Sequence, residues 1–319
     1  MKIVILDARA LNPGDLSYDC ISQFGEVTQY QRTETEAQTI ERIGDSEIVL
    51  VNKVPITETV LAACPNIKLI CVQATGYNIV DTAACAKRGI PVTNVPTYGT
   101  AAVAQFTMAL ILEMCHRIGL HNHSVHQGDW MHAETFCYWL TPQMELAGKT
   151  LGIIGFGRIG QAVGHLAKAF GMKVIAYNRS QTEDGRKIAE YVDLDTLFAE
   201  SDIISLHCPQ TAQTENLINA DTIAKMKDGA MLVNTARGGL VDENALVDAL
   251  ESGKLRYAAL DVVSQEPMQA DNPLLKTRKC IITPHIAWAP VESRQRLLDT
   301  VVENIRAFLD GKPQNVVNL

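Results

Sequence analysis

The sequence predicts an α/β fold with two doubly wound parallel sheets, and three observations lead to this prediction. Short apolar runs alternate with helix-like segments along most of the chain. This alternation begins at the N-terminus and starts a second time near Thr150. The length of 319 residues is also sufficient for two domains of ordinary size. Strands that alternate with helices form parallel sheets with helices on both faces.

The first hundred residues are expected to form the first sheet. The apolar runs that predict its strands are Ile3–Leu6, Glu47–Val51, Leu69–Gln73 and Pro91–Asn94. Two segments between these runs, Ile56–Ala63 and Asp81–Arg88, have helical character. The first run is too short for the apolar core of a signal peptide, so it is interpreted as a buried strand.

The middle of the chain contains a long apolar segment and then a segment without a clear period. Ala101–Ile118 is apolar nearly all round, which predicts a helix buried between layers. The next segment, His121–Gln143, is rich in aromatic residues and histidine. Exposed aromatic side chains here would suit a subunit interface, whereas the alternative is a long packed connection.

Five histidines are crowded into this part of the chain, at positions 116, 121, 123, 126 and 132. A metal site there is conceivable, since imidazole is a common metal ligand. However, no cysteine or carboxylate spacing completes a metal-ligand pattern. We therefore expect a solvated or interface segment and predict no metal.

The second sheet is expected to have six strands, which begin after Thr150. Their predicted ranges are Leu151–Ile154, Lys173–Tyr177, Ile203–His207, Ala230–Asn234, Tyr257–Asp261 and Cys280–Thr283. Helices are predicted between them, including Leu194–Ala199 and Glu243–Ser252. A long amphipathic helix, Val291–Leu309, follows the last strand and is expected to return to the first domain. The predicted domains are therefore 1–98 with 290–319, and 99–289.

The first strand of the second sheet leads into a glycine-rich turn, Gly155-Phe156-Gly157-Arg158-Ile159-Gly160. In this G-x-G-x-x-G pattern, the first glycine permits a tight turn and the second lets the backbone approach a pyrophosphate. The third lets the helix and strand pack closely. The N-terminus of the following helix adds free N–H groups and a positive dipole. A strand before the turn and a second strand after the helix predict a Rossmann-like dinucleotide site, and hydride transfer is the chemistry that such a site favours.

The overall composition excludes several other classes of protein. The net charge is −8 and no basic stripe is present, so we expect neither nucleic acid nor a membrane surface as a partner. No apolar stretch is long enough to span a bilayer. The eight cysteines form no C-x-x-C pair, and most lie in apolar runs, as thiols do in a reducing compartment. The expected location is the cytoplasm.

Three residues that suit the reduction of a 2-oxo acid follow successive strands of the second sheet. Arg237, Glu266 and His285 all come shortly after predicted strand ends, where ligands bind in open α/β sheets. A guanidinium binds a carboxylate with two parallel hydrogen bonds. A histidine can transfer a proton to the carbonyl oxygen, and a neighbouring carboxylate favours its charged form and orients it.

The chain resembles the D-isomer-specific 2-hydroxyacid dehydrogenases, most closely the glycerate dehydrogenase and hydroxypyruvate reductase branch. The resemblance covers nearly the whole length and depends on six motifs. These motifs are Gly155-Phe156-Gly157-Arg158-Ile159-Gly160, Leu206-His207-Cys208-Pro209, Val233-Asn234-Thr235-Ala236-Arg237-Gly238-Gly239, Ala259-Leu260-Asp261-Val262, Glu266-Pro267 and Thr283-Pro284-His285-Ile286-Ala287-Trp288.

The resemblance implies a role for each matching residue. Arg237 would anchor the substrate carboxylate, His285 would be the general acid and base, and Glu266 would pair with His285. The other expected substrate residues are Thr75, Gly76, Trp288 and Arg294. The expected cofactor residues are Gly155, Gly157, Arg158, Ile159, Gly160, Asn178, Arg179, Ser180, Cys208, Pro209, Thr235, Ala236 and Asp261, of which Asp261 would meet the nicotinamide carboxamide. The resemblance also implies a flavodoxin-like substrate domain, discontinuous in sequence, and a homodimer built around segments such as His121–Gln143.

The cofactor could be NADP(H) or NAD(H), and the residues after the second strand of the dinucleotide domain slightly favour NADP(H). Members of the family that prefer NAD have an acidic residue there, but this chain has Asn178 followed by Arg179 and Ser180. The missing carboxylate removes repulsion of a 2′-phosphate, and Arg179 with Ser180 could bind that phosphate. Alternatively, Asn178 bonds the ribose, Arg179 is solvated, and NADH is used.

The predicted activity is the reversible reduction of a small 2-oxo acid, with hydroxypyruvate or glyoxylate giving D-glycerate or glycolate. One alternative is another D-2-hydroxyacid dehydrogenase, acting on D-lactate or a bulkier 2-oxo acid. A second alternative is a dinucleotide sensor without catalysis, because fold alone does not fix function.

Overall fold

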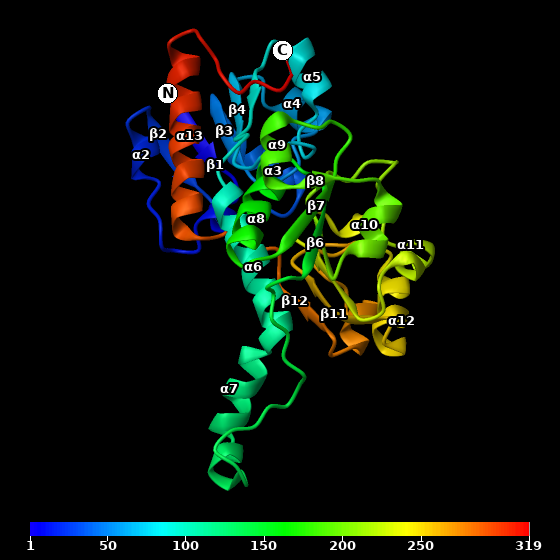
Figure 1. Cartoon of the computed structure of the whole chain (residues 1–319). Helices are drawn as coiled ribbons and strands as arrows, with labels where there is room; N and C mark the ends of the chain where they lie inside the picture. The colour runs from blue at the N-terminus through cyan, green and yellow to red at the C-terminus, as the bar shows by residue number, and fades with distance from the viewer. Residues whose placement is uncertain (319) are drawn as a thin grey trace. The chain divides into compact units, whose positions relative to one another are not determined.

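The computed structural model describes residues 1–318 and contains two compact units. Unit 1 consists of Met1–Gly99 and Ala289–Leu319, and unit 2 of Thr100–Trp288. Each unit contains one sheet with helices around it (Figure 1). The two predicted parallel sheets are confirmed.

The sheet of unit 1 has five parallel strands in the order β2-β1-β3-β4-β5. This order, 2-1-3-4-5, is the flavodoxin-like one. The strands are β1 (Lys2–Ile5), β2 (Glu26–Gln29), β3 (Ile48–Val51), β4 (Leu69–Val72) and β5 (Val92–Thr93). The helices are α1 (Ala8–Leu11), α2 (Asp19–Ser22), α3 (Glu36–Ile43), α4 (Glu58–Ala63), α5 (Thr82–Lys87) and α13 (Val291–Leu309). Strand β2 is absent from the sequence-based prediction because it is a polar edge strand without a fully buried residue.

The core of unit 1 explains why α13 belongs to it. All four residues of β3 and of β4 are buried. Helix α13 packs against this sheet and buries an apolar stripe that includes Leu297, Val301 and Ile305. The predicted return of the long C-terminal helix to the first sheet is therefore observed within this unit.

The sheet of unit 2 has seven parallel strands in the order β12-β11-β10-β9-β6-β7-β8. The strands are β6 (Thr150–Ile154), β7 (Lys173–Tyr177), β8 (Glu190–Tyr191), β9 (Ile203–Leu206), β10 (Ala230–Asn234), β11 (Leu255–Leu260) and β12 (Cys280–Ile282). Six of these match predicted strands, and the two-residue β8 adds an edge. The chain order reverses between β6 and β9, so the glycine turn after β6 lies at the switch point where open α/β sheets bind ligands.

Helices cover both faces of this second sheet. Helices α6 (Thr100–His116) and α8 (Arg158–Ala169) pack on one face. The other face carries α10 (Leu194–Glu200), α11 (Ala220–Lys225) and α12 (Glu243–Ser252). The remaining short elements are α9 (Glu183–Ile188), η2 (Gly238–Leu240) and η3 (Pro273–Lys276). Burial on both faces makes the strands continuously apolar, and this is the pattern that predicted them.

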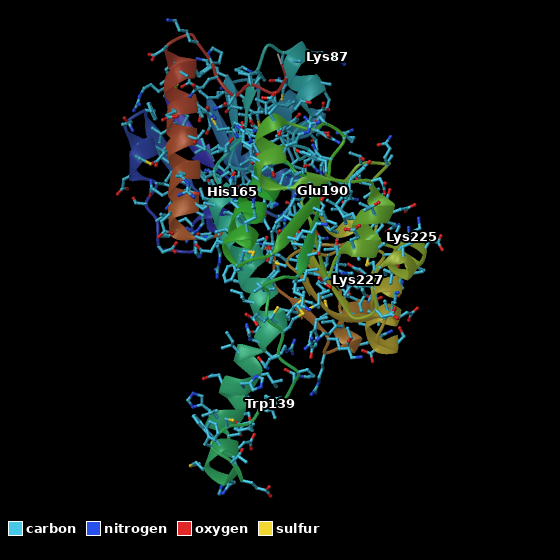
Figure 2. The ribbon with its side chains drawn as sticks, viewed as in Figure 1. Lys87, Trp139, His165, Glu190, Lys225 and Lys227 are labelled. Atoms are coloured by element: carbon cyan, nitrogen blue, oxygen red, sulfur yellow. The ribbon has the colours of Figure 1, made fainter. Side chains whose placement is uncertain are left out.

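Unit 2 also has a projecting segment, residues 118–143, which we call the arm. The predicted long helix ends at His116 rather than Ile118, because Arg117 takes the left-handed conformation with φ of 48°. The arm contains α7 (Ile118–His126) and η1 (Asp129–His132) and extends away from the sheet of its unit (Figure 1). Trp139 lies on its returning half (Figure 2).

The arm's histidines form no obvious metal site. Within residues 1–318, no group of three or more histidine, cysteine or acidic side chains is arranged to hold a metal ion. His121 is instead a structural link: its Nδ1 lies 2.9 Å from the carbonyl oxygen of Arg117, and its Nε2 accepts the N–H of Leu140 at 3.0 Å.

Across the described residues, no single helix has the length and apolarity to span a membrane, although α6 and α7 satisfy both criteria as a pair bent by 57°.

Candidate active site

The glycine turn after β6 has the geometry that a dinucleotide requires. Gly155 has φ of 93°, and a Cβ there would collide with the backbone N of Cys208. A Cβ on Gly160 would collide with the carbonyl oxygen of Gly155. By contrast, a Cβ on Gly157 would meet no atom within 4 Å, although Gly157 directly precedes the first turn of α8. The open space at Gly157 therefore lies where a pyrophosphate would approach the N-terminus of α8.

Asn178 shapes the loop that follows β7. Its Oδ1 accepts the N–H of Phe156 at 3.2 Å, and its Nδ2 donates to the carbonyl oxygen of Ser180 at 2.6 Å. Both halves of the amide therefore have partners within the protein. Arg179 is exposed, and no hydrogen-bond or ion-pair partner for its guanidinium exists in the part of the chain that the structure describes.

Four further expected cofactor residues lie on loops at the carboxyl ends of β9 and β10. Cys208 is half-buried, and its burial raises the pKa of the thiol, while Pro209 is exposed. The hydroxyl of Thr235 lies 3.0 Å from that of Thr107 on α6, and this contact ties the loop to the helix layer. Ala236 is half-buried beside it. These positions surround the same edge of the sheet as the glycine turn.

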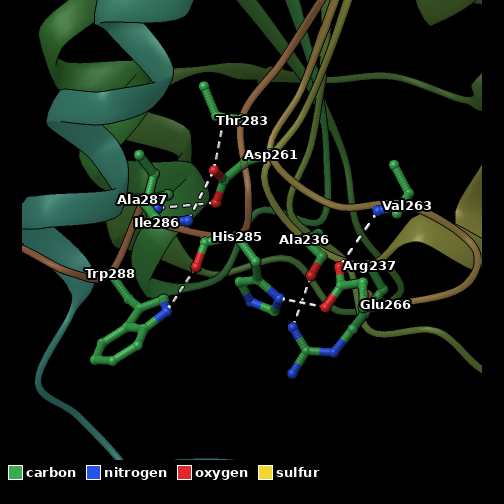
Figure 3. Close-up of polar contacts among 10 residues, drawn as sticks. All are labelled: Ala236, Arg237, Asp261, Val263, Glu266, Thr283, His285, Ile286, Ala287 and Trp288. Carbon is green, nitrogen blue, oxygen red and sulfur yellow. Dashed lines mark hydrogen bonds and ion pairs between the residues drawn. The ribbon is translucent and has the colours of Figure 1, made fainter. Parts of the chain in front are cut away.

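The most distinctive contact in unit 2 joins His285 to Glu266. The Nδ1 atom of His285 lies 2.6 Å from Oε2 of Glu266, with both side chains about one-third exposed (Figure 3). The second carboxylate oxygen, Oε1, accepts the N–H of Val263 at 3.3 Å. A hydrogen bond from Nδ1–H to Glu266 leaves Nε2 as the ring atom that can give or receive a proton.

Asp261 holds the turn on which His285 sits. Its Oδ1 accepts the hydroxyl of Thr283 at 2.6 Å and the N–H of Ile286 at 2.9 Å, and its Oδ2 accepts the N–H of Ala287 at 2.8 Å (Figure 3). His285 itself has φ of 54°, an uncommon conformation for a residue with a Cβ. These bonds fix the turn that carries the imidazole. Asp261 therefore has a structural role in addition to its expected role toward nicotinamide.

Arg237 lies next to the His285–Glu266 pair. The residue is exposed, and its Nη1 donates to the carbonyl oxygen of Ala236 at 2.6 Å (Figure 3). A Cβ on the next residue, Gly238, would collide with the backbone of Val263. The absence of a side chain at Gly238 thus lets the loop of Arg237 approach the loop that leads to Glu266.

Trp288 is the last residue of unit 2 and supports the same turn. Its indole Nε1–H donates to the carbonyl oxygen of His285 at 2.9 Å (Figure 3). The side chain is half-buried rather than fully exposed. The structure therefore places this expected substrate residue in direct contact with the turn of His285.

Unit 1 carries the expected Thr75–Gly76 loop at the carboxyl end of β4. Asn94 donates from Nδ2 to the carbonyl oxygen of Thr75 at 2.7 Å, and the Thr75 hydroxyl donates to the carbonyl oxygen of Val95 at 2.8 Å. Within residues 1–318, no acceptor meets the backbone N–H of Thr75 or Gly76. The loop is thus fixed through its other polar groups while these two N–H groups remain available to a ligand.

Arg294 has a different environment from the one expected for a substrate residue. Its Nη1 and Nη2 each lie 2.6 Å from an oxygen of Asp15, its Nε donates to the carbonyl oxygen of Ala289, and Nη1 also reaches that of Leu11. The side chain is only 7% exposed. These contacts tie the start of α13 to the loop after α1 and use four of the five N–H groups of the guanidinium. Arg294 thus has structural partners within unit 1, and its role toward the substrate stays a prediction.

Two residues of the site have no role predicted from the sequence. Thr283 and Asn234 stand only within the motifs, yet Thr283 bonds Asp261, and Asn234 bonds both Ala236 and Arg237. A polar residue at the end of an otherwise apolar strand is the signal that could have identified Asn234. Buried polar groups of this kind are almost always hydrogen-bonded.

Comparison with known proteins agrees with this geometry. Residues 108–287 match the model of the D-isomer specific 2-hydroxyacid dehydrogenase NAD binding domain. The chain is 52% identical to a hydroxypyruvate reductase of Blautia hydrogenotrophica, with 100% of both chains covered. It is 42% identical to a glycerate dehydrogenase of Methylorubrum extorquens, over 99% of this chain and 98% of that one. Among solved structures, an acyclic imino acid reductase in complex with NADPH and D-Arg matches with a TM-score of 0.85 and 31% identity, covering 99% and 100%.

Proposed function

We propose a function from one premise: this chain belongs to the D-isomer specific 2-hydroxyacid dehydrogenase family. The proposed reaction is the reversible reduction of hydroxypyruvate to D-glycerate, with glyoxylate as a second substrate that gives glycolate. The similarity to a hydroxypyruvate reductase over the full length of both chains supports hydroxypyruvate as the main substrate. Glyoxylate shares the 2-oxo acid group and lacks only the hydroxymethyl substituent.

The observation that carries the proposal is the 2.6 Å contact between His285 and Glu266, beside Arg237. The guanidinium of Arg237 would bind the substrate carboxylate and polarise the neighbouring carbonyl. A reduced nicotinamide dinucleotide, held by its pyrophosphate at the glycine turn, would supply the hydride. The imidazolium of His285 would give its Nε2 proton to the substrate oxygen as the carbonyl carbon is reduced.

Glu266 positions His285 for this reaction. Its carboxylate accepts from Nδ1–H, so it fixes the orientation of the ring and leaves Nε2 toward the substrate. The charged imidazole is the form that can donate a proton to the carbonyl oxygen. In the reverse direction, neutral His285 would take the hydroxyl proton of the 2-hydroxy acid.

In unit 1, we propose that the backbone N–H groups of Thr75 and Gly76 donate hydrogen bonds to a carboxylate. Backbone N–H groups are fixed in direction and cost no side-chain entropy when they bind an anion. The contacts of Asn94 and Val95 hold this loop from its other side.

We propose NADPH as the preferred cofactor, with NADH also accepted. The amide of Asn178 is used within the loop, and Arg179 is exposed without a protein partner among the described residues. A charge-assisted hydrogen bond contributes about 1.5–3 kcal/mol, so Arg179→Ala should lower the NADPH/NADH ratio of kcat/KM by roughly tenfold or more.

The matched control for Arg179→Ala is Lys187→Ala. Lys187 is an exposed cation on nearby α9, but it already pairs with Asp184 at 2.7 Å. The ratio should remain unchanged in this control. An unchanged ratio in Arg179→Ala as well would remove the proposed phosphate contact.

The activity itself is tested by initial rates with hydroxypyruvate, glyoxylate and pyruvate, each with NADPH and with NADH at equal concentration. We expect the highest kcat/KM for hydroxypyruvate and slower turnover of glyoxylate. Preference for pyruvate would point to a D-lactate dehydrogenase. No turnover by protein that still binds the dinucleotide would contradict the proposed function and favour a sensor.

We further propose a homodimer formed through the arm. Large apolar side chains are exposed there, including Met131 at 81%, Phe136 at 89% and Trp139 at 67%. A concentration of such side chains on a projecting segment is typical of a protein–protein contact. Sedimentation equilibrium should give twice the chain mass of 34.9 kDa, whereas Phe136→Asp with Trp139→Asp should give the monomer. A monomeric wild-type protein at micromolar concentration would contradict this part of the proposal.

The cytoplasm is the location that we propose. All eight cysteines are free thiols, and several are buried in apolar surroundings. Burial raises the pKa of Cys71 and of Cys280 to about 12, so their thiols stay protonated and unreactive. A reducing compartment is consistent with this set of thiols.

A further inference from the structure

Asn234 is a fully buried polar residue that connects the loop of Arg237 to the rest of the site. It is the last residue of β10 and its exposure is 0%. Its side-chain Oδ1 accepts the N–H of Ala236 at 2.9 Å, and its Nδ2 donates to the carbonyl oxygen of Arg237 at 2.8 Å. The amide therefore spans the turn that presents the guanidinium.

The same residue is joined to the turn of His285 through the backbone. The carbonyl oxygen of Asn234 accepts the N–H of Asp261 at 2.9 Å, and the carbonyl oxygen of Asp261 accepts the N–H of His285 at 2.8 Å. Strands β10 and β11 run side by side here, with Asn234 paired to Leu260. A continuous series of hydrogen bonds thus runs from Arg237 through Asn234 and Asp261 to His285.

Only an amide of this length can make both side-chain contacts. Aspartate would keep the acceptor for the N–H of Ala236 but lose the donor to Arg237, and it would set a carboxylate against that carbonyl oxygen. Alanine would lose both contacts and leave the N–H of the half-buried Ala236 without this partner. The carbonyl oxygen of Arg237 would then keep only the longer contact from the N–H of Leu240, at 3.3 Å.

We propose that Asn234 is a positioning residue that fixes Arg237, the proposed carboxylate-binding group, relative to His285, the proposed proton donor. This inference rests on the proposed function, because it assigns Asn234 a task in the binding of a 2-oxo acid. Asn234 is buried beneath the loop and acts through the backbone of Ala236 and Arg237. Its loss should therefore weaken carboxylate binding much more than proton transfer.

The consequence is a specific pattern of kinetic effects. Asn234→Ala should raise KM for hydroxypyruvate by at least tenfold and lower kcat by less than threefold. The pH profile of kcat/KM should keep its shape, because His285 and Glu266 keep their contact. The Kd for NADPH should rise much less than the KM for hydroxypyruvate, since the glycine turn lies after a different strand and, of the expected cofactor residues, only Ala236 contacts the Asn234 amide. Asn234→Ser should recover part of the loss, because a hydroxyl can still accept the N–H of Ala236.

The experiment compares these variants with Ser201→Ala in the full-length protein. Ser201 is also 0% exposed, and its hydroxyl donates to the carbonyl oxygen of Leu197 at 2.6 Å. It precedes β9 and so lies at the opposite, amino edge of the same sheet. Ser201→Ala therefore also removes a buried hydrogen bond, and we expect it to lower Tm without changing KM.

A second readout does not require turnover. Oxamate, a carboxylate analogue of 2-oxo acids, is titrated calorimetrically into each variant in the presence of NADPH. Asn234→Ala should raise the Kd of oxamate at least tenfold in the wild-type background. In the Arg237→Lys background the same substitution should change this Kd by less than threefold, because two residues that act as one unit are not additive.

The possible outcomes separate the inference from the proposed function. Equal changes of KM and oxamate Kd in Asn234→Ala and Ser201→Ala would overturn the inference, as would an equal effect of Asn234→Ala in both Arg237 backgrounds. A wild-type protein that reduces no 2-oxo acid would contradict the proposed function, but the oxamate titration would still test Asn234. If Asn234→Ala does not fold, Asn234→Ser supplies the comparison, with an expected rise in oxamate Kd of about threefold.

Discussion

Two buried aspartates, one in each unit, perform the same structural task with different results. Asp7 follows β1 in unit 1 and accepts the N–H groups of Asn52 and Lys53, at 2.9 and 2.6 Å. Asp261 follows β11 in unit 2 and accepts the N–H groups of Ile286 and Ala287, with the Thr283 hydroxyl. Each carboxylate therefore holds the loop that follows a neighbouring strand of its own sheet.

The difference is in what each held loop carries. The loop on Asp261 presents the imidazole of His285 at a positive φ, and Glu266 meets that ring. The loop on Asp7 presents backbone and the exposed Lys53. Burial raises the pKa of Asp7, because desolvation outweighs the N–H donors around it. The same way of fixing a strand-end loop thus serves either the reaction or the fold, depending on the side chains that the loop bears.

The largest expected effect comes from removal of the group that the Asp261 loop carries. His285→Gln should lower kcat by about 10²–10⁴-fold, the range for a lost general acid. The Kd for NADPH, measured by fluorescence quenching, should not change, because the glycine turn is untouched. A loss of kcat smaller than tenfold would show that His285 is not the proton donor.

The next prediction compares the two aspartates directly. Asp261→Asn replaces one acceptor oxygen by an NH₂ group that cannot accept the N–H bonds of Ile286 or Ala287. We expect kcat/KM to fall by about 100-fold through displacement of His285, since leaving such donors unpaired costs about 1–3 kcal/mol each. Asp7→Asn should change Tm but leave kcat/KM within threefold. Equal kinetic losses in the two variants would break the comparison.

Part of the fold and of the candidate site could be predicted from the sequence. Both sheets, the glycine turn and the group of Arg237, Glu266 and His285 could be found, because apolar periodicity and strand-end position are local features. Strand β2 could not, since its four residues are polar or only half-buried and pair with β1 alone. The structural roles of Asp261 and Asn234 could not be predicted from the sequence either, because their partners are separated from them in sequence or are backbone atoms.

Two further features of the chain depend on contacts that the sequence does not specify. The end of α6 at His116 depends on the backbone conformation of Arg117, whose guanidinium lies 5.1 Å from the ring centroid of Tyr257. The resemblance implies a substrate role for Arg294 but does not reveal its ion pair with Asp15, which is almost the whole chain away.

A third prediction concerns pH and unit 2. Burial lowers the pKa of His207 from 6.5 to about 4. Between these two pH values, the imidazole is therefore neutral in the folded protein but protonated in the unfolded chain. The contribution of His207 to the free energy of unfolding should therefore be constant above pH 6.5, fall as the pH drops toward 4, and level off below that. The contribution of His207 to this fall is about 3 kcal/mol. Urea unfolding across this range should show a smaller pH dependence in His207→Gln, and an unchanged dependence would contradict the assignment.

The smallest expected effect tests the ion pair of unit 1. The Arg294 guanidinium holds the pKa of Asp15 below its usual range. The stabilisation from this pair is present above the usual pKa of aspartate and is lost as the pH falls through the lowered value. Asp15→Asn should thus lower Tm at pH 7 by only about 2 °C, because the carboxylate of Asp15 is exposed and water weakens the ion pair. Calorimetry should show this difference shrinking below about pH 4, and a difference that persists there would exclude the ion pair as its cause.

The most direct test of the whole account is the chirality of the product. Hydroxypyruvate is incubated with NADPH and the protein, and the glycerate formed is resolved by chiral chromatography. We expect D-glycerate alone, in an amount equal to the NADPH oxidised. L-glycerate, a racemate or no glycerate at all would contradict the claim that this chain is a D-specific hydroxypyruvate reductase.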